Sequence, residues 1–216
     1  MANQETAYGL RPIGLTGSAT NSTGLTKYEI ASDNTNAIFQ YSLVVPTSSG
    51  VIDQAGATSG GTTAALGVLM GVEYVDSSSK KTVFRNFWAG SSNVSVDTNH
   101  PIKALVADNP MQTFQVARDA SLTNRATALA CVFANASLGT SARTGSTDTG
   151  RSNSALSVSS IATTATLPLK IMGIVDDEAN SDFTAAGIPL IVRINAHYNS
   201  PNARFDSQTT ATTTGI

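Results

Sequence analysis

The last hydrophobic segment of the chain, residues 188–196, alternates apolar and polar side chains with a period of two. Arg193 and Asn195 occupy polar positions of this alternation. The apolar positions are Ile188, Leu190, Val192, Ile194 and Ala196. Successive side chains of a strand point to opposite faces, so this pattern predicts a strand with one buried face and does not suit a helix. A strand with one buried face must pair with other strands, so we expect a β-sheet whose apolar face forms the core.

The same strand signal recurs in shorter segments that are separated by glycine, proline, asparagine and serine. These residues favour the turns that connect antiparallel strands. Residues 66–75 and 80–88 predict one hairpin, and residues 102–107 and 113–118 predict another short pair. Further strands are predicted at residues 27–30, 38–45, 156–161 and 167–175.

One segment, residues 122–136, departs from the strand pattern. It is rich in alanine, contains no glycine or proline, and follows Ser121, a candidate helix cap. Its apolar residues Ala126, Leu129 and Val132 have helical spacing, so we expect a helix there. The next stretch, residues 137–166, is dominated by small and polar residues and predicts a long surface loop with a short strand near its end.

Many short strands with a single helix predict a mainly β fold, an antiparallel β-barrel or sandwich with one short α-helix and extended terminal arms. We divide the chain into an N-terminal arm (residues 1–26), a single mainly β body (27–198) and a polar C-terminal tail (199–216). The arm carries apolar residues between glycines. We therefore expect it to dock on its own body or on a neighbour, with a free tail as the alternative.

Composition limits the classes of partner. Charged residues make up 13% of the 216 residues, about half of the roughly 25% found in ordinary globular domains, and the net charge is -2. Without a cluster of lysine and arginine, the release of counterions that drives nucleic-acid binding is small. No apolar stretch approaches the roughly 20 residues of a membrane span, and the first residues do not resemble a signal peptide. We expect neither a nucleic acid nor a membrane as partner.

Few residues are suited to catalysis or to metal binding. The two histidines, His100 and His197, are expected to be solvated or locally bonded, and Cys131 to be a buried thiol. A serine hydrolase elbow of the form Gly-x-Ser-x-Gly is absent, and one cysteine with two histidines cannot complete a structural zinc site. The acidic triplet at 176–178 lacks the alternating aspartates of a calcium loop. We predict no catalytic, cofactor or metal residues, and no enzyme.

Aromatic residues gather in the hairpin predicted at 66–88. They are Tyr74, Phe84, Phe87 and Trp88. Such residues form hydrophobic cores, and they are also enriched at the centres of protein interfaces. Both roles remain open, because the two faces of a strand can serve different partners.

Several segments, in order along most of the chain, resemble a family of small structural proteins of tailed phages that infect aquatic bacteria, including cyanobacteria. These segments are residues 2–4, 6–13, 71–74, 84–90, 107–110, 114–116, 145–152, 169–175 and 192–195. Residues 6–13, Thr-Ala-Tyr-Gly-Leu-Arg-Pro-Ile, carry the firmest part of the likeness.

The resemblance implies a capsid decoration or cement protein without catalytic activity. Such a protein binds the major capsid protein on the outer face of the virion, is a homotrimer, and meets the capsid in the host cytoplasm during assembly. Possible capsid or subunit contacts are then Tyr8, Leu10, Arg11, Pro12 and Ile13. The alternatives are a carbohydrate-binding or adhesion module on the virion, another virion structural component, or a hydrolase that uses the acidic triplet.

Overall fold

The computed structural model of the chain describes residues 6–16, 24–56, 64–139, 143–175, 177 and 182–200. Within these residues the secondary structure is mainly strand, with one short α-helix and one 3-10 turn. The strands are β1 (Arg11–Leu15), β2 (Thr26–Ile30), β3 (Leu43–Pro46), β4 (Ile52–Gln54), β5 (Gly67–Val75), β6 (Thr82–Arg85), β7 (Ile102–Ala107), β8 (Gln112–Ala117), β9 (Asn135–Ala136), β10 (Leu169–Ile174) and β11 (Pro189–Ile194). The helix is α1 (Arg125–Ala130), and the 3-10 turn is η1 (Val158–Ser160).

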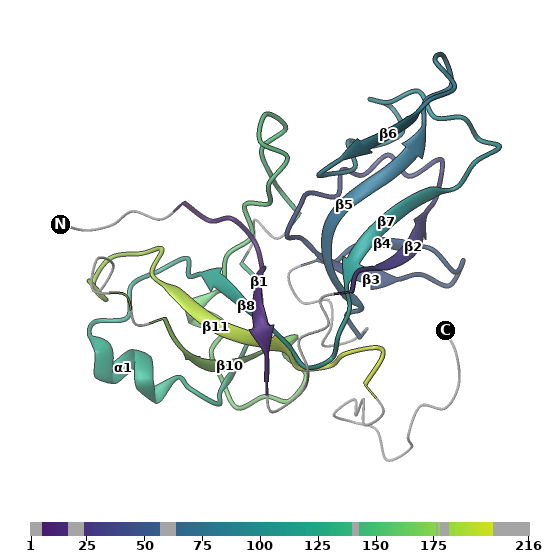
Figure 1. Cartoon of the computed structure of the whole chain (residues 1–216). Helices are drawn as coiled ribbons and strands as arrows, with labels where there is room; N and C mark the ends of the chain where they lie inside the picture. The colour runs from purple at the N-terminus through teal and green to yellow at the C-terminus, as the bar shows by residue number, and fades with distance from the viewer. Residues whose placement is uncertain are drawn as a thin grey trace.

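The strands form two antiparallel sheets, which occupy different parts of the molecule (Figure 1). Sheet A has the order β1-β8-β11-β10-β9, and sheet B has the order β2-β7-β5-β3-β4, with β6 paired to β5. Neither sheet closes into a barrel. The fold is therefore mainly β and sandwich-like, and of the two predicted architectures the sandwich is the one observed.

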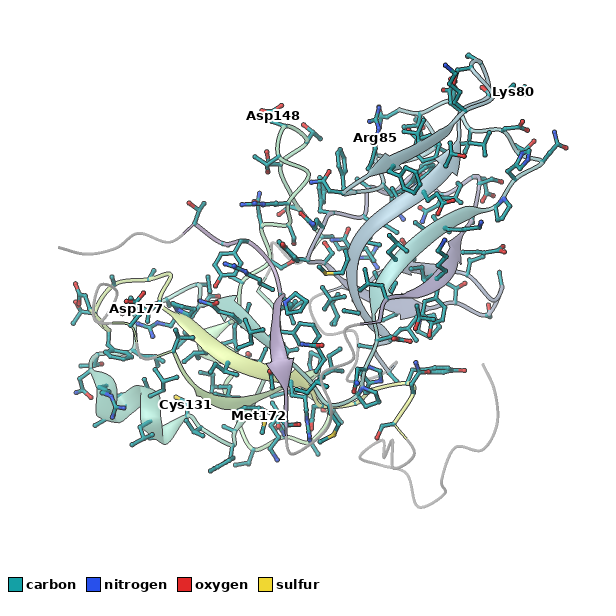
Figure 2. All side chains as sticks on the ribbon, viewed as in Figure 1. Lys80, Arg85, Cys131, Asp148, Met172 and Asp177 are labelled. Atoms are coloured by element: carbon teal, nitrogen blue, oxygen red, sulfur yellow. The ribbon has the colours of Figure 1, made fainter. Side chains whose placement is uncertain are left out.

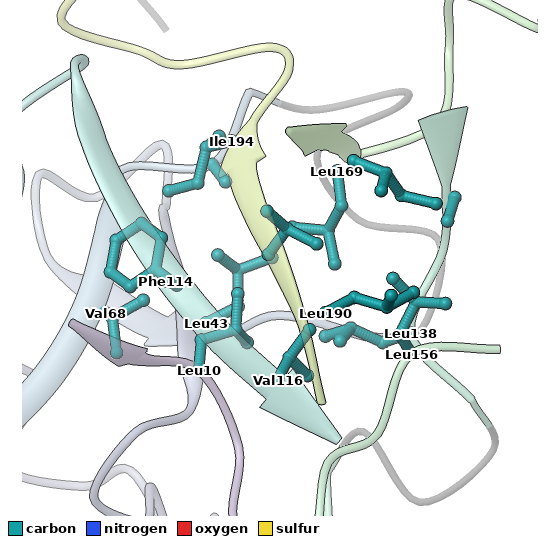
Figure 3. Packing of buried hydrophobic residues seen from close by; sticks show 14 of the residues in the cluster. Leu10, Leu43, Val68, Phe114, Val116, Leu138, Leu156, Leu169, Leu190 and Ile194 are labelled. Atoms are coloured by element: carbon teal, nitrogen blue, oxygen red, sulfur yellow. The ribbon is translucent and has the colours of Figure 1, made fainter. Parts of the chain in front are cut away.

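A shared hydrophobic cluster joins the two sheets. Phe114 of β8 and Leu190 of β11 belong to the same buried cluster as Leu43 of β3 and Val68 of β5 (Figure 3). A second cluster within sheet B surrounds Trp88. The sheets are therefore held together by burial of apolar side chains that both contribute.

One of the predicted strand pairs is confirmed and one is wrong. β5 pairs with β6, as expected, and the strands predicted at 167–175 and 188–196 correspond to β10 and β11, which pair with each other. β7 and β8 do not pair with each other: β7 lies between β2 and β5 in sheet B, and β8 lies between β1 and β11 in sheet A. The carboxylate of Asp108 accepts hydrogen bonds from the hydroxyls of Thr26 and Tyr28 at the end of β7. This contact fixes the chain where it leaves one sheet for the other.

Two other predicted strands differ from the structure. The segment 38–45 is interrupted at Tyr41, whose φ of 67° is incompatible with a continuous strand, and β3 begins only at Leu43. In the segment 156–161, Leu156 makes isolated bridges, and the 3-10 turn η1 follows. Apolar residues interspersed with polar ones over six or eight positions were therefore not sufficient to define these strands.

The predicted helix at 122–136 is too long. α1 begins after Asn124, whose side chain accepts a hydrogen bond from the backbone N–H of Thr127 at 2.9 Å, so Asn124 and not Ser121 is the cap. Phe133 then adopts a φ of 72° and donates its backbone N–H to Ile171, which turns the chain into β9. Cys131, expected to be buried, is half-exposed, and partial burial raises the pKa of its thiol.

Part of the predicted surface loop, residues 143–153, forms a narrow hairpin that rises between the two sheets, with Asp148 near its tip (Figures 1 and 2). Its backbone exchanges hydrogen bonds with Gln40, and the Asn86 side chain donates to the carbonyl of Thr149 at 2.7 Å. Gly145 and Gly150 pack so closely against Phe39 and against Asn86 and Phe87 that neither position has room for a Cβ atom. The hairpin is therefore firmly attached to the sheet B side of the molecule.

The described part of the predicted N-terminal arm, residues 6–16, docks on the chain's own body. Residues 11–15 form β1 at one edge of sheet A. The remainder of the arm up to residue 26 includes residues 1–5 and 17–23, which lie outside the described residues, as do residues 201–216 of the predicted tail. Of the docking alternatives, attachment to the same chain is the one seen for residues 6–16.

Candidate functional site

The five residues predicted to contact a partner lie in three different environments. Leu10 is 0% exposed and belongs to the core cluster between the sheets, so its side chain is not available to a partner. Tyr8 and Arg11 line a polar cleft on one side of the N-terminal strand. Pro12 and Ile13 line an apolar hollow on another side. The N-terminal strand therefore borders two distinct candidate binding surfaces.

The polar cleft has a volume of about 600 Å³. Four parts of the chain that are distant in sequence meet there: the N-terminal segment, Tyr41, Gln115 of β8, and the 143–153 hairpin. Its lining residues are Thr6, Ala7, Tyr8, Arg11, Tyr41, Gln115, Ser146, Thr149, Arg151, Ser152 and Asn153.

Backbone hydrogen bonds hold the walls of the polar cleft in place. Gly9 donates its N–H to the carbonyl of Ser154 at 3.0 Å, and Leu10 donates to the carbonyl of Tyr41 at 2.8 Å. Gly9 has a φ of 84°, and a Cβ added to it would collide with the Tyr41 carbonyl and lie 2.9 Å from the Ser152 side chain. Only glycine fits this close approach, which brings the N-terminal segment against the hairpin.

Tyr41 adopts a left-handed backbone conformation that is rare for a bulky side chain, at a cost of about 1 to 2 kcal/mol. Its N–H donates to Leu69, and its carbonyl accepts from Leu10, so neighbouring segments on both sides hold it in this conformation. The side chain of Tyr41 lines the polar cleft. Strained residues that are retained in this way occur often at binding sites.

Two cations define the electrostatics of the polar cleft. Among the described residues, Arg11 and Arg151 are the charged residues of its lining, and both are exposed. No carboxylate of this part of the chain lies within 4.0 Å of either guanidinium. A surface with two such cations attracts an anionic group.

The apolar hollow has a volume of about 280 Å³ and lies beside β1. Ile13 and Leu25 line it and are 47% and 42% exposed. The carbonyl of Gly14 accepts hydrogen bonds from the side chains of Gln112 and Thr113, which fixes β1 at its bulge. The other lining residues are Pro12, Gly14, Gly24, Met70, Ala107 and Gln112.

β1 is also an edge strand. It pairs with β8 on one side, and no other strand among the described residues pairs with it. An open edge adjacent to exposed apolar side chains is a typical place for another chain to bind. The short length of β1, its bulge and its proline limit unspecific pairing at this edge.

The two histidines occupy different environments. His100 Nδ1 lies 3.6 Å from the carboxylate of Asp97, and the hydrogen bond from Lys80 helps to lower the pKa of Asp97 to about 2. Of the two predicted states, His197 is locally bonded and not solvated: it is 2% exposed and lies beyond the end of β11 at Ile194. Its Nδ1 accepts the N–H of Asn199 at 3.1 Å, and burial lowers its pKa to about 4.

The remaining candidate sites are the acidic triplet at 176–178 and the aromatic hairpin at 66–88. Of the acidic triplet, Asp177 is exposed, whereas Asp176 and Glu178 lie outside the described residues. Within the described part of the chain, no group of three or more histidine, cysteine, aspartate or glutamate side chains is arranged to hold a metal ion. In the aromatic hairpin, Trp88, Tyr74 and Phe87 are buried and only Phe84 is exposed, at 70%.

The fold and these surfaces define a mainly β protein with two antiparallel sheets and two hollows along its N-terminal strand. Its described residues include no helix with the length and apolar character needed to cross a bilayer. The chain matches no protein-family model, and no curated protein or solved structure is significantly similar to it. The function of the two hollows is therefore inferred from the residues that line them.

Proposed function

We propose that this chain is a non-enzymatic structural protein of a tailed-phage virion that binds the outer face of the capsid and cements neighbouring capsomers. Its partners are then the major capsid protein and further copies of itself in a homotrimer, and it joins the capsid in the host cytoplasm during assembly. The sequence resemblance described above supports this assignment. Neither nucleic acid nor membrane is part of it.

The observation that carries the proposal is the position of the family-like segment 6–13. The segment leads into β1, the open edge of sheet A, and its last residue, Ile13, projects into an apolar hollow together with Leu25. Ile13 and Leu25 are large apolar residues that leave more than two fifths of their surface in water. A partner that covers them gains free energy in proportion to the apolar area that it buries.

Repetition of a modest contact provides the mechanism. A protein that binds the assembled shell and not the separated subunits shifts the equilibrium toward the shell, by an amount that grows with its concentration over the dissociation constant. When each molecule contacts more than one capsomer, the second contact is formed at high effective concentration. Many copies that each add a few kcal/mol would therefore resist the pressure of packaged DNA. The low charge of the chain keeps electrostatic repulsion between neighbouring copies small.

The test uses particles that lack this protein, to which purified protein is added back. Wild-type protein should co-sediment with the particles at a copy number close to that of the shell subunit, and should restore their resistance to heat and low salt. Ile13→Asp and Leu25→Asp should each reduce binding by about tenfold or more, because an unpaired carboxylate is costly to bury in an apolar contact.

Phe84→Asp is the matched control. It introduces the same carboxylate at an exposed apolar residue of β6 in sheet B, which lies away from the apolar hollow. It should bind particles like the wild type. Light scattering of the free protein should give about three times the 22.3 kDa mass of one chain. Deficient particles that are as stable as complete ones, or a copy number typical of a tail component, would rule the proposal out.

A further inference from the structure

We propose that the polar cleft is a binding site for an acidic saccharide, a sugar that carries a carboxylate group. Arg11 and Arg151 would hold the carboxylate, and the hydroxyl, amide and phenol side chains around them would bind the sugar ring and its hydroxyl groups. This inference stands independently of the capsid function, because it concerns a different surface and a different ligand.

The charge of the cleft selects the anionic part of the ligand. Arg11 comes from β1 and Arg151 comes from the hairpin, yet both line the same hollow. Each guanidinium is exposed, and the described residues provide no carboxylate partner for either. The planar fork of an arginine matches the two oxygens of a carboxylate, and such charge-assisted hydrogen bonds are stronger than neutral ones.

The volume of the cleft and its uncharged lining residues suit a sugar ring. A volume of about 600 Å³ is larger than a single carboxylate requires and falls in the range of roughly 300 to 1,000 Å³ that is usual for small-molecule sites. Thr149, Gln115 and Asn153 provide hydroxyl and amide groups, which can pair with sugar hydroxyls. The rings of Tyr8 and Tyr41 provide apolar faces as well as phenol groups.

The site is also rigid before any ligand arrives. The close approach at Gly9 and the strained conformation of Tyr41 fix two of its walls, and the hydrogen bonds of Gln40 to the backbone of residues 150 and 152 fix the hairpin wall. A preorganised site loses less conformational entropy on binding, which favours small ligands with few contacts.

An acidic peptide is the less suitable ligand for this cleft. A peptide that binds as an extended strand needs unpaired backbone groups along the wall. The N–H groups of Gly9 and Leu10, which lie in the wall, are already bonded to Ser154 and Tyr41. The groups that remain for a ligand are side chains, and their chemistry is that of a hydroxyl-rich anion.

Titration calorimetry with the full chain tests the proposal with four probes: digalacturonate, the neutral disaccharide of galactose with the same linkage, triglutamate and inorganic sulfate. Digalacturonate should bind with a stoichiometry of one per chain and should weaken as salt is added. The neutral disaccharide should bind at least about tenfold more weakly, because it lacks the charge-assisted bonds.

Variants then locate the site. Arg11→Gln and Arg151→Gln should each weaken digalacturonate binding by about tenfold or more, since each removes one cation from the cleft. Arg85→Gln is the control, because Arg85 is an exposed arginine of β6 that is not among the residues lining the cleft. Circular dichroism of each variant checks that the fold is kept. If a variant unfolds, the comparison of the four probes on the wild-type protein still decides whether the protein prefers an acidic saccharide.

Several results would overturn the inference: no saturable binding of digalacturonate at millimolar concentration, equal binding of the neutral disaccharide, tighter binding of triglutamate or sulfate, or equal losses in the Arg85 control. The particle-binding assay keeps the two proposals separate. Arg151→Gln should leave particle binding intact, whereas Ile13→Asp should leave digalacturonate binding intact.

Discussion

The rings of Phe39 and Phe87 stack with their centroids 5.5 Å apart and their planes 6° from parallel. Gly145 lies directly against the Phe39 ring, and Gly150 lies against Phe87 and the Asn86 side chain. The stacked pair thus forms the platform on which the 143–153 hairpin rests, and the absence of side chains at the two glycines lets the backbone approach it.

We expect Gly145→Ala to destabilise the protein by about 1 to 3 kcal/mol, the usual cost of forcing an extra methyl group into a filled space. Urea unfolding would measure the change in the free energy of unfolding. Gly24→Ala is the control, since no atom of the described residues lies within 4 Å of the site of its added Cβ, and it should change stability by less than about 0.5 kcal/mol. Equal effects of the two substitutions would contradict the close packing of the hairpin on the stacked rings.

Leu10→Ala tests whether the N-terminal segment belongs to the core. The side chain of Leu10 is fully buried among residues of both sheets, so its truncation should cost about 2 to 5 kcal/mol. Ile13→Ala, three residues further on, removes a half-exposed side chain and should cost less than about 1 kcal/mol. An unaffected unfolding midpoint in Leu10→Ala would mean that this segment is not docked in solution.

Buried His197 should make stability depend on pH. Burial lowers its pKa from 6.5 to about 4 in the folded chain, although the nearby Asp108 carboxylate opposes this change. Between these two values the unfolded chain binds more protons, so the free energy of unfolding should fall as the pH drops from about 6.5 to about 4. The loss is at most roughly 3 kcal/mol.

His197→Gln should flatten this part of the pH profile, measured by urea unfolding at several pH values. His100→Gln is the control, because the His100 side chain is 55% exposed and lies beside Asp97. It should leave the slope between pH 6.5 and 4 unchanged. A slope that persists in His197→Gln would assign the effect to another group.

Arg118 connects β8 to the segment before β11 through its guanidinium. The side chain is 2% exposed and donates to the carbonyls of Ala120, Phe183 and Ala185 at 3.0, 2.8 and 3.0 Å. Arg118→Met keeps much of the volume but leaves these carbonyls without the donor, so we expect a loss of about 2 to 4 kcal/mol. Thermal unfolding compared with Arg85→Met, at an exposed arginine, would measure it. A similar midpoint in both variants would show that the three bonds contribute little.

The pattern of apolar and polar residues within single segments was sufficient to predict part of the fold. The pairing of β5 with β6 was predicted from two strand-like segments separated by a short polar turn, and the strands β10 and β11 were predicted from their apolar residues. The placement of β7 and β8 in different sheets could not be anticipated, because a short polar connection looks the same whether it closes a hairpin or carries the chain to a second sheet. The helix end was missed for a related reason: the backbone conformation of Phe133 depends on its bond to Ile171, which is distant in sequence.

The candidate site was only partly visible in the sequence. Tyr8, Arg11, Pro12 and Ile13 were selected from the resemblance, and they do border the two hollows. Arg151 could be noticed only as part of the matching segment 145–152, because its proximity to the N-terminal strand depends on the hairpin and on Gly9. Leu10 was selected from the same resemblance, but its side chain lies in the core.

The edge formed by β1 has a consequence for the order of events during synthesis. Gly14 of β1 accepts a hydrogen bond from Thr113, 99 positions later in the chain. A ribosome that adds 5 to 20 residues per second needs roughly 5 to 20 s to cover that distance. During this time the first strand has been translated but its pairing partner has not. A partner that recognises the finished edge therefore meets only chains whose translation has passed β8, which delays docking until nearly half of the polypeptide has followed the first strand.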